Sequence, residues 1–217
     1  MSAGDLPRLR RNENSRTRLL AVIEHDVRRL DRLISDISDA SRLDAELQRQ
    51  DMSPVDLRRL LTTLTSVANE TKLGHDIAVE ARFEGRGASD TFSVPGHDSR
   101  LGQVVSNLLS NAQSFSNAGG KVRILCRRIR TGVEILVDDD GPGIRPDALE
   151  RIFERFYTDR PHQGFGQNSG LGLSISKQII EAHGGRVWAE NRLGPAGDDD
   201  DEPTVVGARF VVRLPAS

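Results

Sequence analysis

The chain has 217 residues, with 30 basic and 32 acidic side chains and a net charge of −2 at pH 7. Such a chain can bury a core as one large or two modest domains. Its balanced charge argues against nucleic acid or an anionic membrane as the main partner. The single Cys126 excludes a disulfide framework and is expected to be a core residue of a strand. Because no apolar run reaches the roughly 20 residues of a membrane-spanning helix, we expect a chain of cytoplasmic type.

Residues 15–47 predict one long helix with an apolar stripe. The stripe alternates at spacings of four and three residues, and its first members are Ile23, Val27, Leu30 and Ile34. This is the spacing of the seam in a helix hairpin or a coiled-coil dimer. Because one helix cannot bury such a stripe alone, we expect a partner helix from a second chain and hence a homodimer.

The segment QRQDMSP (48–54) breaks the helical pattern, so we place a domain boundary here, with residues 1–49 before it and 50–217 after it. Pro54 suits the first turn of a new helix, and Asp98 suits the cap of the helix SRLGQVVSNLLSNAQSF. A helix near PDALERIFERF and another at LGLSISKQIIEAHG are also expected. The strand-like stretches are IAVEARFEG, KVRILCRRI, VEILVDD, RVWAENR and GARFVVRLP. This mixed order with antiparallel hairpins predicts an α+β sandwich rather than a doubly wound parallel sheet.

Two motifs place polar groups beside apolar ones. In SNLLSNA, Asn107 and Asn111 are four residues apart and share one helix face; most such residues are simply exposed, but an amide oxygen is also a suitable ligand for Mg²⁺. In VDDDGPGI, Asp139 ends a predicted buried strand, where its carboxylate can accept a hydrogen bond from an exocyclic amine such as that of adenine. Gly141 and Gly143 let the backbone approach a flat ring, although an ordinary turn with an acidic cap has the same pattern.

Two further motifs surround a glycine-rich stretch. In FERFY (153–157), we expect both phenylalanines to pack in the core and Arg155 to face an anion. In GFGQNSGLGLSISKQII (164–180), Gly170 and Gly172 precede a helix, and backbone N–H groups at a helix start bind phosphate well. The stretch lacks the lysine of a P-loop, and no βαβ unit of the Rossmann kind surrounds it.

In their order and spacing, the four motifs resemble those of the catalytic ATP-binding domain of sensor histidine kinases, within the gyrase/Hsp90/MutL-like ATPase superfamily. The resemblance covers about residues 53–215, with SNLLSNA as the N box, DDDGPGI as the G1 box, FERFY as the F box and GLGL as the G2 box. It implies ATP and Mg²⁺ as cofactors and a response regulator receiver domain as a partner. The parent kinase would be anchored in the inner membrane by segments outside this chain.

The resemblance also implies a role for each motif residue. Asn111 would hold Mg²⁺ with Asn107 nearby, and Asp139 would recognise the adenine amine beside a wall shaped by Gly141 and Gly143. The implied phosphate end of the site has a mobile lid from about residue 157 to 169, and its residues are Arg155, Tyr157, Gly170, Leu171 and Gly172. One departure is Ser114, three places after Asn111, where the family often has a basic residue.

The family phosphorylates a histidine whose usual setting is His-Glu-x-x-x-Pro-Leu. His25 is followed by an acid, but Arg29 and Leu30 stand where Thr or Asn and Pro are usual. Only one helix is expected between His25 and the ATP-binding domain, so we interpret it as the second helix of the dimerisation hairpin, with the acceptor histidine outside this chain. The stretch DVRRLDRLISDISDASRLDAEL resembles that helix in the alphaproteobacterial ExoS/ChvG-type membrane kinases.

Three other functions are compatible with parts of the pattern. An anti-sigma-type serine kinase would use the same ATP-binding fold, but the long seam helix and the F box argue against it. A non-catalytic dimeric scaffold that binds nucleotide is the second alternative, and the intact motif residues argue against it. A gyrase- or MutL-like ATPase would need a glutamate near the N box to activate water, and SNLLSNAQS contains none.

Overall fold

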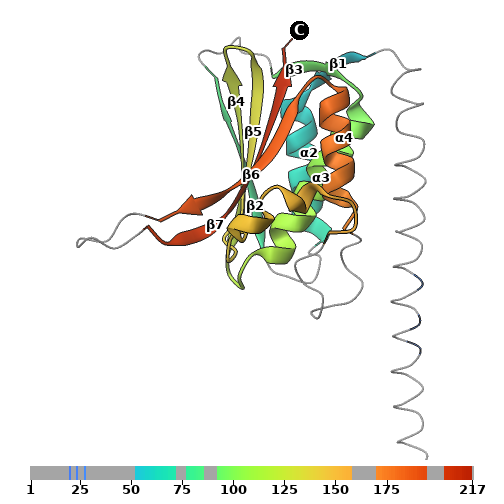
Figure 1. Cartoon of the computed structure of the whole chain (residues 1–217). Coiled ribbons are helices and arrows are strands. Elements are labelled where there is room, and N and C mark those ends of the chain that lie inside the picture. The colour runs from blue at the N-terminus through green and yellow to red at the C-terminus, as the bar shows by residue number, and fades with distance from the viewer. Residues whose placement is uncertain are drawn as a thin grey trace, which may run out of the picture.

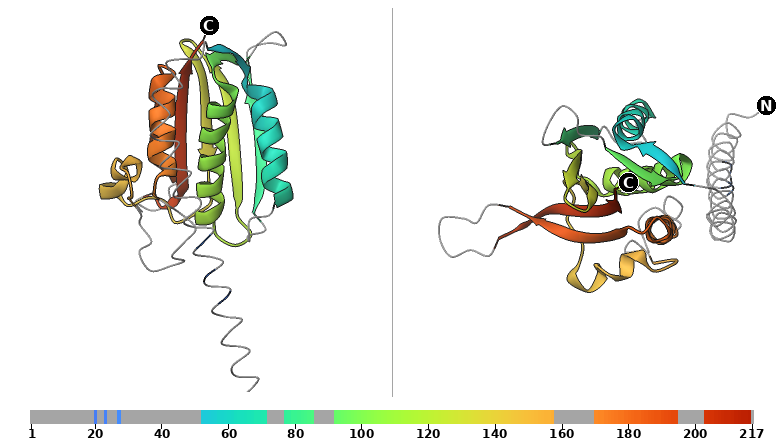
Figure 2. Two further views of the ribbon diagram at one scale, coloured as in Figure 1. Left: turned by 90° about the vertical axis from the view of Figure 1, so that its right-hand side faces the viewer. Right: turned by 90° about the horizontal axis from the view of Figure 1, so that it is seen from above.

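The computed structural model describes Leu20, Ile23, Val27 and residues 52–71, 77–85, 92–157, 170–194 and 203–216. In these ranges, one face of a five-stranded sheet is covered by a layer of helices (Figures 1 and 2). The helices are α2 (Leu57–Thr71), α3 (Asp98–Phe115) and α4 (Gly172–Ala182). The strands are β2 (Ala78–Glu84), β4 (Lys121–Ile129), β5 (Gly132–Asp138), β6 (Arg186–Leu193) and β7 (Val205–Pro215).

The spatial order of the strands is β2-β4-β5-β7-β6. Strands β2 and β4 are parallel, and each of the other neighbouring pairs is antiparallel. The parallel pair is joined by a connection that contains α3, as parallel neighbours require. This arrangement places the end of β5 in the middle of the sheet beside the start of β7, next to the carboxyl end of α3.

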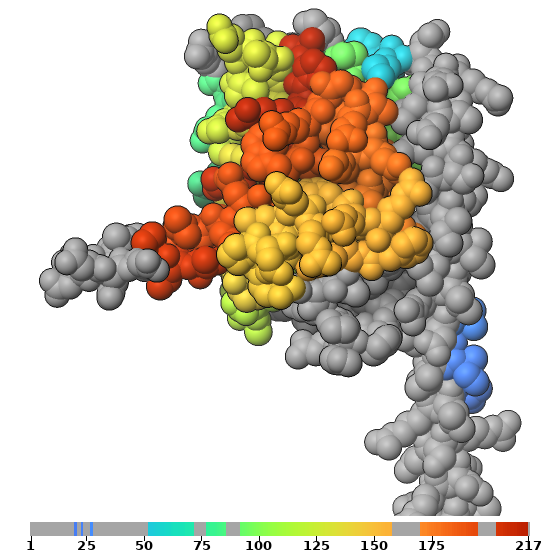
Figure 3. Space-filling view, viewed as in Figure 1, coloured from blue at the N-terminus to red at the C-terminus, as the bar shows by residue number. Residues whose placement is uncertain are grey.

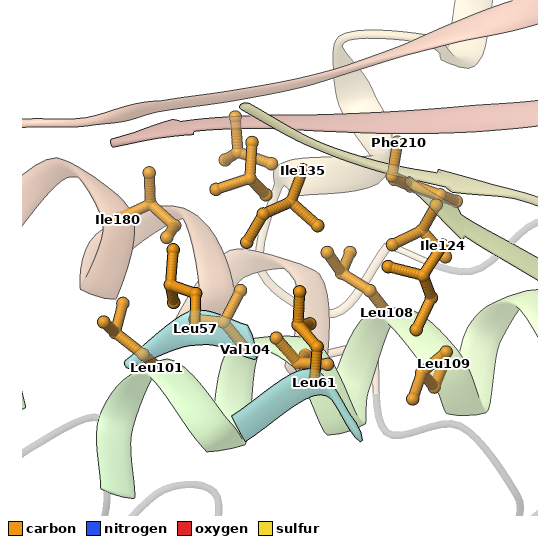
Figure 4. Close-up of a cluster of buried hydrophobic side chains, with 14 of the residues drawn as sticks. Leu57, Leu61, Leu101, Val104, Leu108, Leu109, Ile124, Ile135, Ile180 and Phe210 are labelled. Atoms are coloured by element: carbon orange, nitrogen blue, oxygen red, sulfur yellow. The ribbon is translucent and has the colours of Figure 1, made fainter. Parts of the chain in front are cut away.

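The core lies between the helices and the inner face of the sheet (Figure 4). Leucines that recur at helical spacing on α2 and α3 point toward branched and aromatic residues of the strands, as the apolar periodicity predicts. The labelled members include Leu57, Leu61, Leu101, Leu108, Ile124, Ile135, Ile180 and Phe210. Cys126 is fully buried among them, which confirms its predicted place in the core.

Strand β5 is buried on both faces, although helices cover only one. On the outer face, Glu134 is covered by Arg127 and Arg213, whose Nε atoms lie 2.7 and 2.6 Å from its two carboxylate oxygens. Alternation along the strand turns Asp138 to this outer face and the next residue, Asp139, inward. The inward direction of the Asp139 side chain therefore follows from the alternation of side chains along β5.

Two predictions for helix starts are wrong. Pro54 does not begin a helix but lies in β1 (Ser53–Asp56), which pairs antiparallel with β3 (Ser93–Gly96). A two-stranded sheet has only edge strands, so the missing N–H of proline is tolerated. Asp56 instead accepts a hydrogen bond from the N–H of Arg59, 3.2 Å away, at the start of α2. The cap position of α3 is His97, and Asp98 is the first helical residue.

The segment PDALERIFERF forms two short 3-10 turns, η1 (Pro146–Ala148) and η2 (Arg151–Phe153), instead of the predicted helix. Each turn buries one residue: Ala148 for η1 and Phe153 for η2. Two separate short turns are enough to bury these two residues, so the segment does not need to form a continuous helix. Figure 3 shows this gold-coloured part of the chain against the orange of α4 and β6.

For the predicted seam helix, the structure describes three residues. Leu20, Ile23 and Val27 are helical and each is more than half exposed, which agrees with a stripe that the single chain leaves unburied. His25 and the predicted domain boundary between residues 49 and 50 lie outside the described residues, so both stay predictions. No helix among the described residues is long and apolar enough to cross a membrane.

Candidate functional site

Asp139 is the central residue of the candidate site. Its side chain is 2% exposed, and its Oδ1 atom accepts hydrogen bonds from the backbone N–H groups of Gly141 at 2.9 Å and Ala208 at 3.0 Å. No described residue donates a hydrogen bond to its second oxygen, Oδ2. Burial raises the pKa of Asp139 above its ordinary value, and the two backbone donors oppose that shift. The residue is therefore a fixed, buried acceptor with one oxygen left for a ligand.

The loop after β5 is joined to the end of α3. The N–H of Asn117 donates to the carbonyl of Asp140 at 3.1 Å, and a Cβ atom on Gly141 would lie 2.6 Å from the carbonyl oxygen of Phe115. Only glycine permits this approach of two backbones. The predicted N-box helix and the G1-box loop therefore form one wall.

Asn107 connects the N box to the G2 box. Its amide nitrogen donates to the carbonyl oxygen of Gly172 at 3.0 Å and lies 3.3 Å from the hydroxyl of Ser176, both on α4. This places the start of α4 against the middle of α3. Asn107 thus has a structural use that spacing alone did not predict, because its partner is 65 residues away.

Asn111 lies one helical turn beyond Asn107 and is half-buried. Among the described residues, no hydrogen bond uses its side-chain amide, whereas its backbone carbonyl accepts one from the Ser114 hydroxyl at 2.9 Å. In the same part of the chain, no cluster of three or more His, Cys, Asp or Glu side chains could hold a metal. A single amide oxygen fits Mg²⁺ that takes its remaining ligands from substrate phosphates and water.

The F box and the G2 box meet directly. The N–H of Phe156 donates to the carbonyl of Gly170 at 2.9 Å, so Tyr157, the first residue of the predicted lid, lies close to Gly170, which directly follows the lid. Tyr157 contacts two arginines: Arg151 lies 4.9 Å from its ring centre and Arg145 lies 3.4 Å from its hydroxyl. The rest of the predicted lid, residues 158–169, falls outside the described residues.

The prediction for the two phenylalanines of FERFY is right for one and wrong for the other. Phe153 is buried and packs edge-on against Phe210, with 6.5 Å between ring centres. Phe156 is 63% exposed and has a left-handed backbone, with φ of 65°. Its carbonyl carbon and Cα sit so close to Gly170 that a Cβ there would lie under 3 Å away. The hydrogen bond to Gly170 thus fixes the backbone of Phe156 and leaves its ring outside the core.

The remaining predicted residues differ in how they can act. Arg155 is exposed, as an anion contact requires. Leu171 is 2% exposed and belongs to the core, so only its backbone can face a ligand. Gly143 has φ of 79°, and a side chain there would collide with Val205 and Asn191.

A chain of ion pairs surrounds the outer side of the same loop. Asp138 binds Arg209 through two contacts of 2.7 Å, and Asp140 binds Arg123 through contacts of 2.7 and 3.1 Å. Arg192 lies between them, 3.0 Å from Asp140 and 3.4 Å from Asp138. Hydrogen bonding to Arg123 lowers the pKa of Asp140 to about 2. The loop therefore carries ionised, paired carboxylates on its outer side and one buried acceptor on its inner side.

Sequence reasoning missed three residues that touch this loop: Asn191, Arg192 and Ala208. All three lie on β6 and β7, about 50 to 70 residues after Asp139. Asparagine and arginine within a strand-like stretch look like ordinary surface residues, and a backbone donor such as Ala208 leaves no mark in the sequence. Only the strand register brings them to the loop.

Residues 96–217 match the protein family described as Histidine kinase-, DNA gyrase B-, and HSP90-like ATPase. Over 216 residues, the chain is 50% identical to Sensor protein ChvG of Agrobacterium fabrum (strain C58). The match covers 98% of this chain and 35% of ChvG. The chain thus spans about a third of the length of this curated relative.

Two solved structures of histidine kinases are similar. Full-length ShkA in complex with AMPPNP has a TM-score of 0.68 and 26% identity, covering 93% of this chain and 40% of ShkA. Histidine kinase ThkA in complex with response regulator protein TrrA has a TM-score of 0.65 and 25% identity, covering 90% of this chain and 50% of ThkA. The similarity confirms the predicted α+β fold class.

Proposed function

Because the chain belongs to the histidine kinase-, DNA gyrase B-, and HSP90-like ATPases, we propose that it is the ATP-binding catalytic portion of a ChvG-like sensor histidine kinase. The 50% identity to ChvG supports the kinase branch of this family. The observation that carries the proposal is the buried carboxylate of Asp139, which has two backbone donors on one oxygen and none from the described residues on the other. Such an acceptor is suited to the exocyclic amine of adenine.

The proposed site divides into a base end and a phosphate end. At the base end, ionised Asp139 accepts a hydrogen bond from the adenine amine. Gly141 and Gly143 shape the wall beside it, because close contacts with the rest of the protein leave no room for a side chain at either position. At the phosphate end, the first N–H groups of α4, after Gly170 and Leu171, face the anionic chain. Exposed Arg155, the one basic residue of FERFY, is the F-box candidate for an additional phosphate contact.

Asn111 would supply the one protein ligand to Mg²⁺, which neutralises the charge that develops on the phosphates. Asn107, in this proposal, sets the distance between that ligand and the phosphate end, since it already joins α3 to α4. The nearby Ser114 hydroxyl bonds back to Asn111. It therefore supports the backbone of the magnesium residue and does not replace the basic residue common in the family.

The proposed reaction moves the γ-phosphoryl group of ATP to an imidazole nitrogen. The bond between the γ-phosphorus and the oxygen that bridges it to the β-phosphate breaks, a P–N bond forms, and ADP leaves. Positioning and electrostatic stabilisation provide most of the rate enhancement. We propose that the acceptor is a hairpin histidine other than His25, because Arg29 and Leu30 replace the usual residues around it.

The proposed partners follow the same relatives. The ThkA structure contains a response regulator, and we propose that the phosphoryl group here passes to an aspartate of such a receiver domain. The exposed helical residues Ile23 and Val27 support a homodimer through the seam helix. We propose that the working unit is the cytoplasmic part of a larger, membrane-anchored sensor; the match to only 35% of Sensor protein ChvG supports a larger parent protein.

Calorimetric titration with AMPPNP, with and without Mg²⁺, tests the binding proposal. Asn111→Ala should retain the metal-free affinity and lose the enhancement by Mg²⁺, whereas the exposed neighbour Ser110→Ala should behave like the unaltered chain. An enhancement that survives in Asn111→Ala would mean that the metal ligand lies elsewhere.

Labelling with γ-labelled ATP tests the acceptor. We expect no acid-labile label on the chain alone. Label that disappears in His25→Gln would identify His25 as the acceptor and overturn that part of the proposal. Transfer to an added serine-containing partner protein would favour the serine-kinase alternative.

A further inference from the structure

The end of β6 holds the G1 loop through one asparagine side chain. Asn191 Oδ1 accepts a hydrogen bond from the N–H of Ile144 at 2.7 Å, and its Nδ2 donates to the carbonyl of Ile144 at 2.7 Å. The side-chain amide therefore binds both backbone groups of one residue, as a neighbouring strand would. Ile144 comes directly after the second glycine of the G1 motif.

The fit between this amide and the loop is close. A Cβ on Gly143 would lie 2.8 Å from Asn191 Oδ1, and the left-handed φ of 79° at Gly143 turns the chain toward β6. Glycine is thus required here by the approach of Asn191. This pair of hydrogen bonds between Asn191 and Ile144, called the asparagine joint below, connects two elements that are 47 residues apart in the chain.

The next residue, Arg192, holds the other end of the loop. Its Nη1 donates to the backbone carbonyl of Asp139 at 2.6 Å and lies 3.0 Å from Oδ1 of Asp140. The β6–β7 register shifts directly after Arg192, and its partner on β7 is Gly207. A side chain on Gly207 would collide with the same Asp139 carbonyl. The strand ends are therefore shaped around the backbone of Asp139.

We propose that Asn191 and Arg192 are positioning residues for base recognition: together they hold both ends of the loop from Asp139 to Ile144, so that the Asp139 carboxylate is fixed before nucleotide binds. This inference rests on the proposed function, since it assigns a ligand to Asp139. A preformed acceptor avoids the cost of ordering the loop on binding. It also penalises a base that presents a carbonyl in place of the amine, because two acceptors would then face each other.

The consequence is a measurable selectivity for adenine over guanine nucleotides. Guanine carries a carbonyl oxygen where adenine carries its exocyclic amine. A rigid loop cannot retreat from this oxygen, whereas a loosened loop can. Loss of the joint should therefore lower the affinity for ADP and reduce the ADP-to-GDP preference together.

The chain contains a matched control for the asparagine joint. Asn69 on α2 makes the same pair of hydrogen bonds, 2.9 Å each, to the N–H and carbonyl of Val79 on β2. Strand β2 is at the opposite edge of the sheet from β6. Asn69→Ala thus removes an equivalent two-bond joint from a place without a role in the proposed site.

The test is calorimetric titration of the chain with ADP and with GDP, together with thermal unfolding of each variant. Asn191→Ala should lower ADP affinity about tenfold, as expected for lost ordering hydrogen bonds, and reduce the ADP-to-GDP ratio. Asn69→Ala should lower the unfolding temperature about as much as Asn191→Ala does, but it should change neither the ADP affinity nor the ADP-to-GDP ratio. Arg192→Met should act like Asn191→Ala. Arg186→Met, on the same strand but beside Trp188, should leave both the ADP affinity and the ADP-to-GDP ratio unchanged.

The outcomes separate the two levels of the proposal. Unchanged ADP affinity and selectivity in folded Asn191→Ala and Arg192→Met, with a wild-type chain that binds ADP, would overturn the positioning role alone. A wild-type chain that binds neither nucleotide would overturn the proposed function and this inference with it. If Asn191→Ala does not fold, Asn191→Asp keeps the bond from the Ile144 N–H and loses only the one to its carbonyl. A reduced ADP-to-GDP ratio in that variant supports the role, and an unchanged ratio overturns it.

Discussion

Replacement of Asp139 by asparagine changes the candidate site by one atom type and no volume. Oδ1 is already occupied by the N–H groups of Gly141 and Ala208, so asparagine must point its amide oxygen toward them. Its NH₂ group then takes the position of Oδ2, where the adenine amine would also present a donor. The opposite orientation would set the NH₂ against two backbone donors. Neither orientation restores an acceptor for the base.

The expected loss follows from the kind of bond removed. A hydrogen bond to a charged group contributes about 1.5–3 kcal/mol, and the loss corresponds to roughly a 10- to 150-fold weaker affinity for ADP. Calorimetric titration measures it directly. Glu134→Gln is the control, because Glu134 is an equally buried carboxylate on β5 whose partners are Arg127 and Arg213. That variant should lose stability and keep its affinity. An unchanged ADP affinity in Asp139→Asn would refute the assigned role of Asp139.

Three further predictions concern the fold around the site. Burial lowers the pKa of His183, and its neutral ring accepts from the His97 N–H at 3.1 Å and donates to the Ile179 carbonyl at 2.7 Å. Unfolded His183 therefore binds a proton first as the pH falls below about 6.5, and urea unfolding should show an acid loss of stability that is smaller in His183→Gln. Burial also raises the pKa of Cys126 to about 12, so a thiol reagent at pH 8 should modify it only after denaturation; modification of the folded chain at the same rate would contradict its buried place. Gly207→Ala should cost at least about 2 kcal/mol of unfolding free energy, because its Cβ would collide with the Asp139 carbonyl, whereas Gly119→Ala, with φ of 78° and open space around it, should cost about 1 kcal/mol.

The four motifs were predictable from the sequence because each has a local pattern. Asn107 and Asn111 share a helix face by spacing, and Asp139 directly follows an apolar stretch that forms the buried strand β5. The structure brings three of the motif pairs together through backbone or amide hydrogen bonds. Their common location could be expected only from the family resemblance, since no spacing rule links residues 65 positions apart.

The errors have a common physical source. Pro54 and Asp98 carry strong local preferences for helix starts, but pairing of β1 with β3 decided the conformation of Pro54, and α3 is capped one residue earlier than the predicted cap at Asp98. Phe156 looked like a core residue because of its type, whereas a hydrogen bond to Gly170 fixed its backbone in a left-handed form. Tertiary contacts overrode local propensity for Pro54 and Phe156. Asn191 and Arg192 could not be predicted as site residues for the same reason, since only the pairing of β5, β7 and β6 brings them to the loop from Asp139 to Ile144.

A crystal structure of the chain with Mg²⁺ and AMPPNP tests the central claim most directly. The account predicts the adenine amine within hydrogen-bond distance of Asp139 Oδ2, the metal on the side-chain oxygen of Asn111, and the phosphates at the start of α4. A nucleotide bound elsewhere, or a base whose amine does not face Asp139, would contradict it.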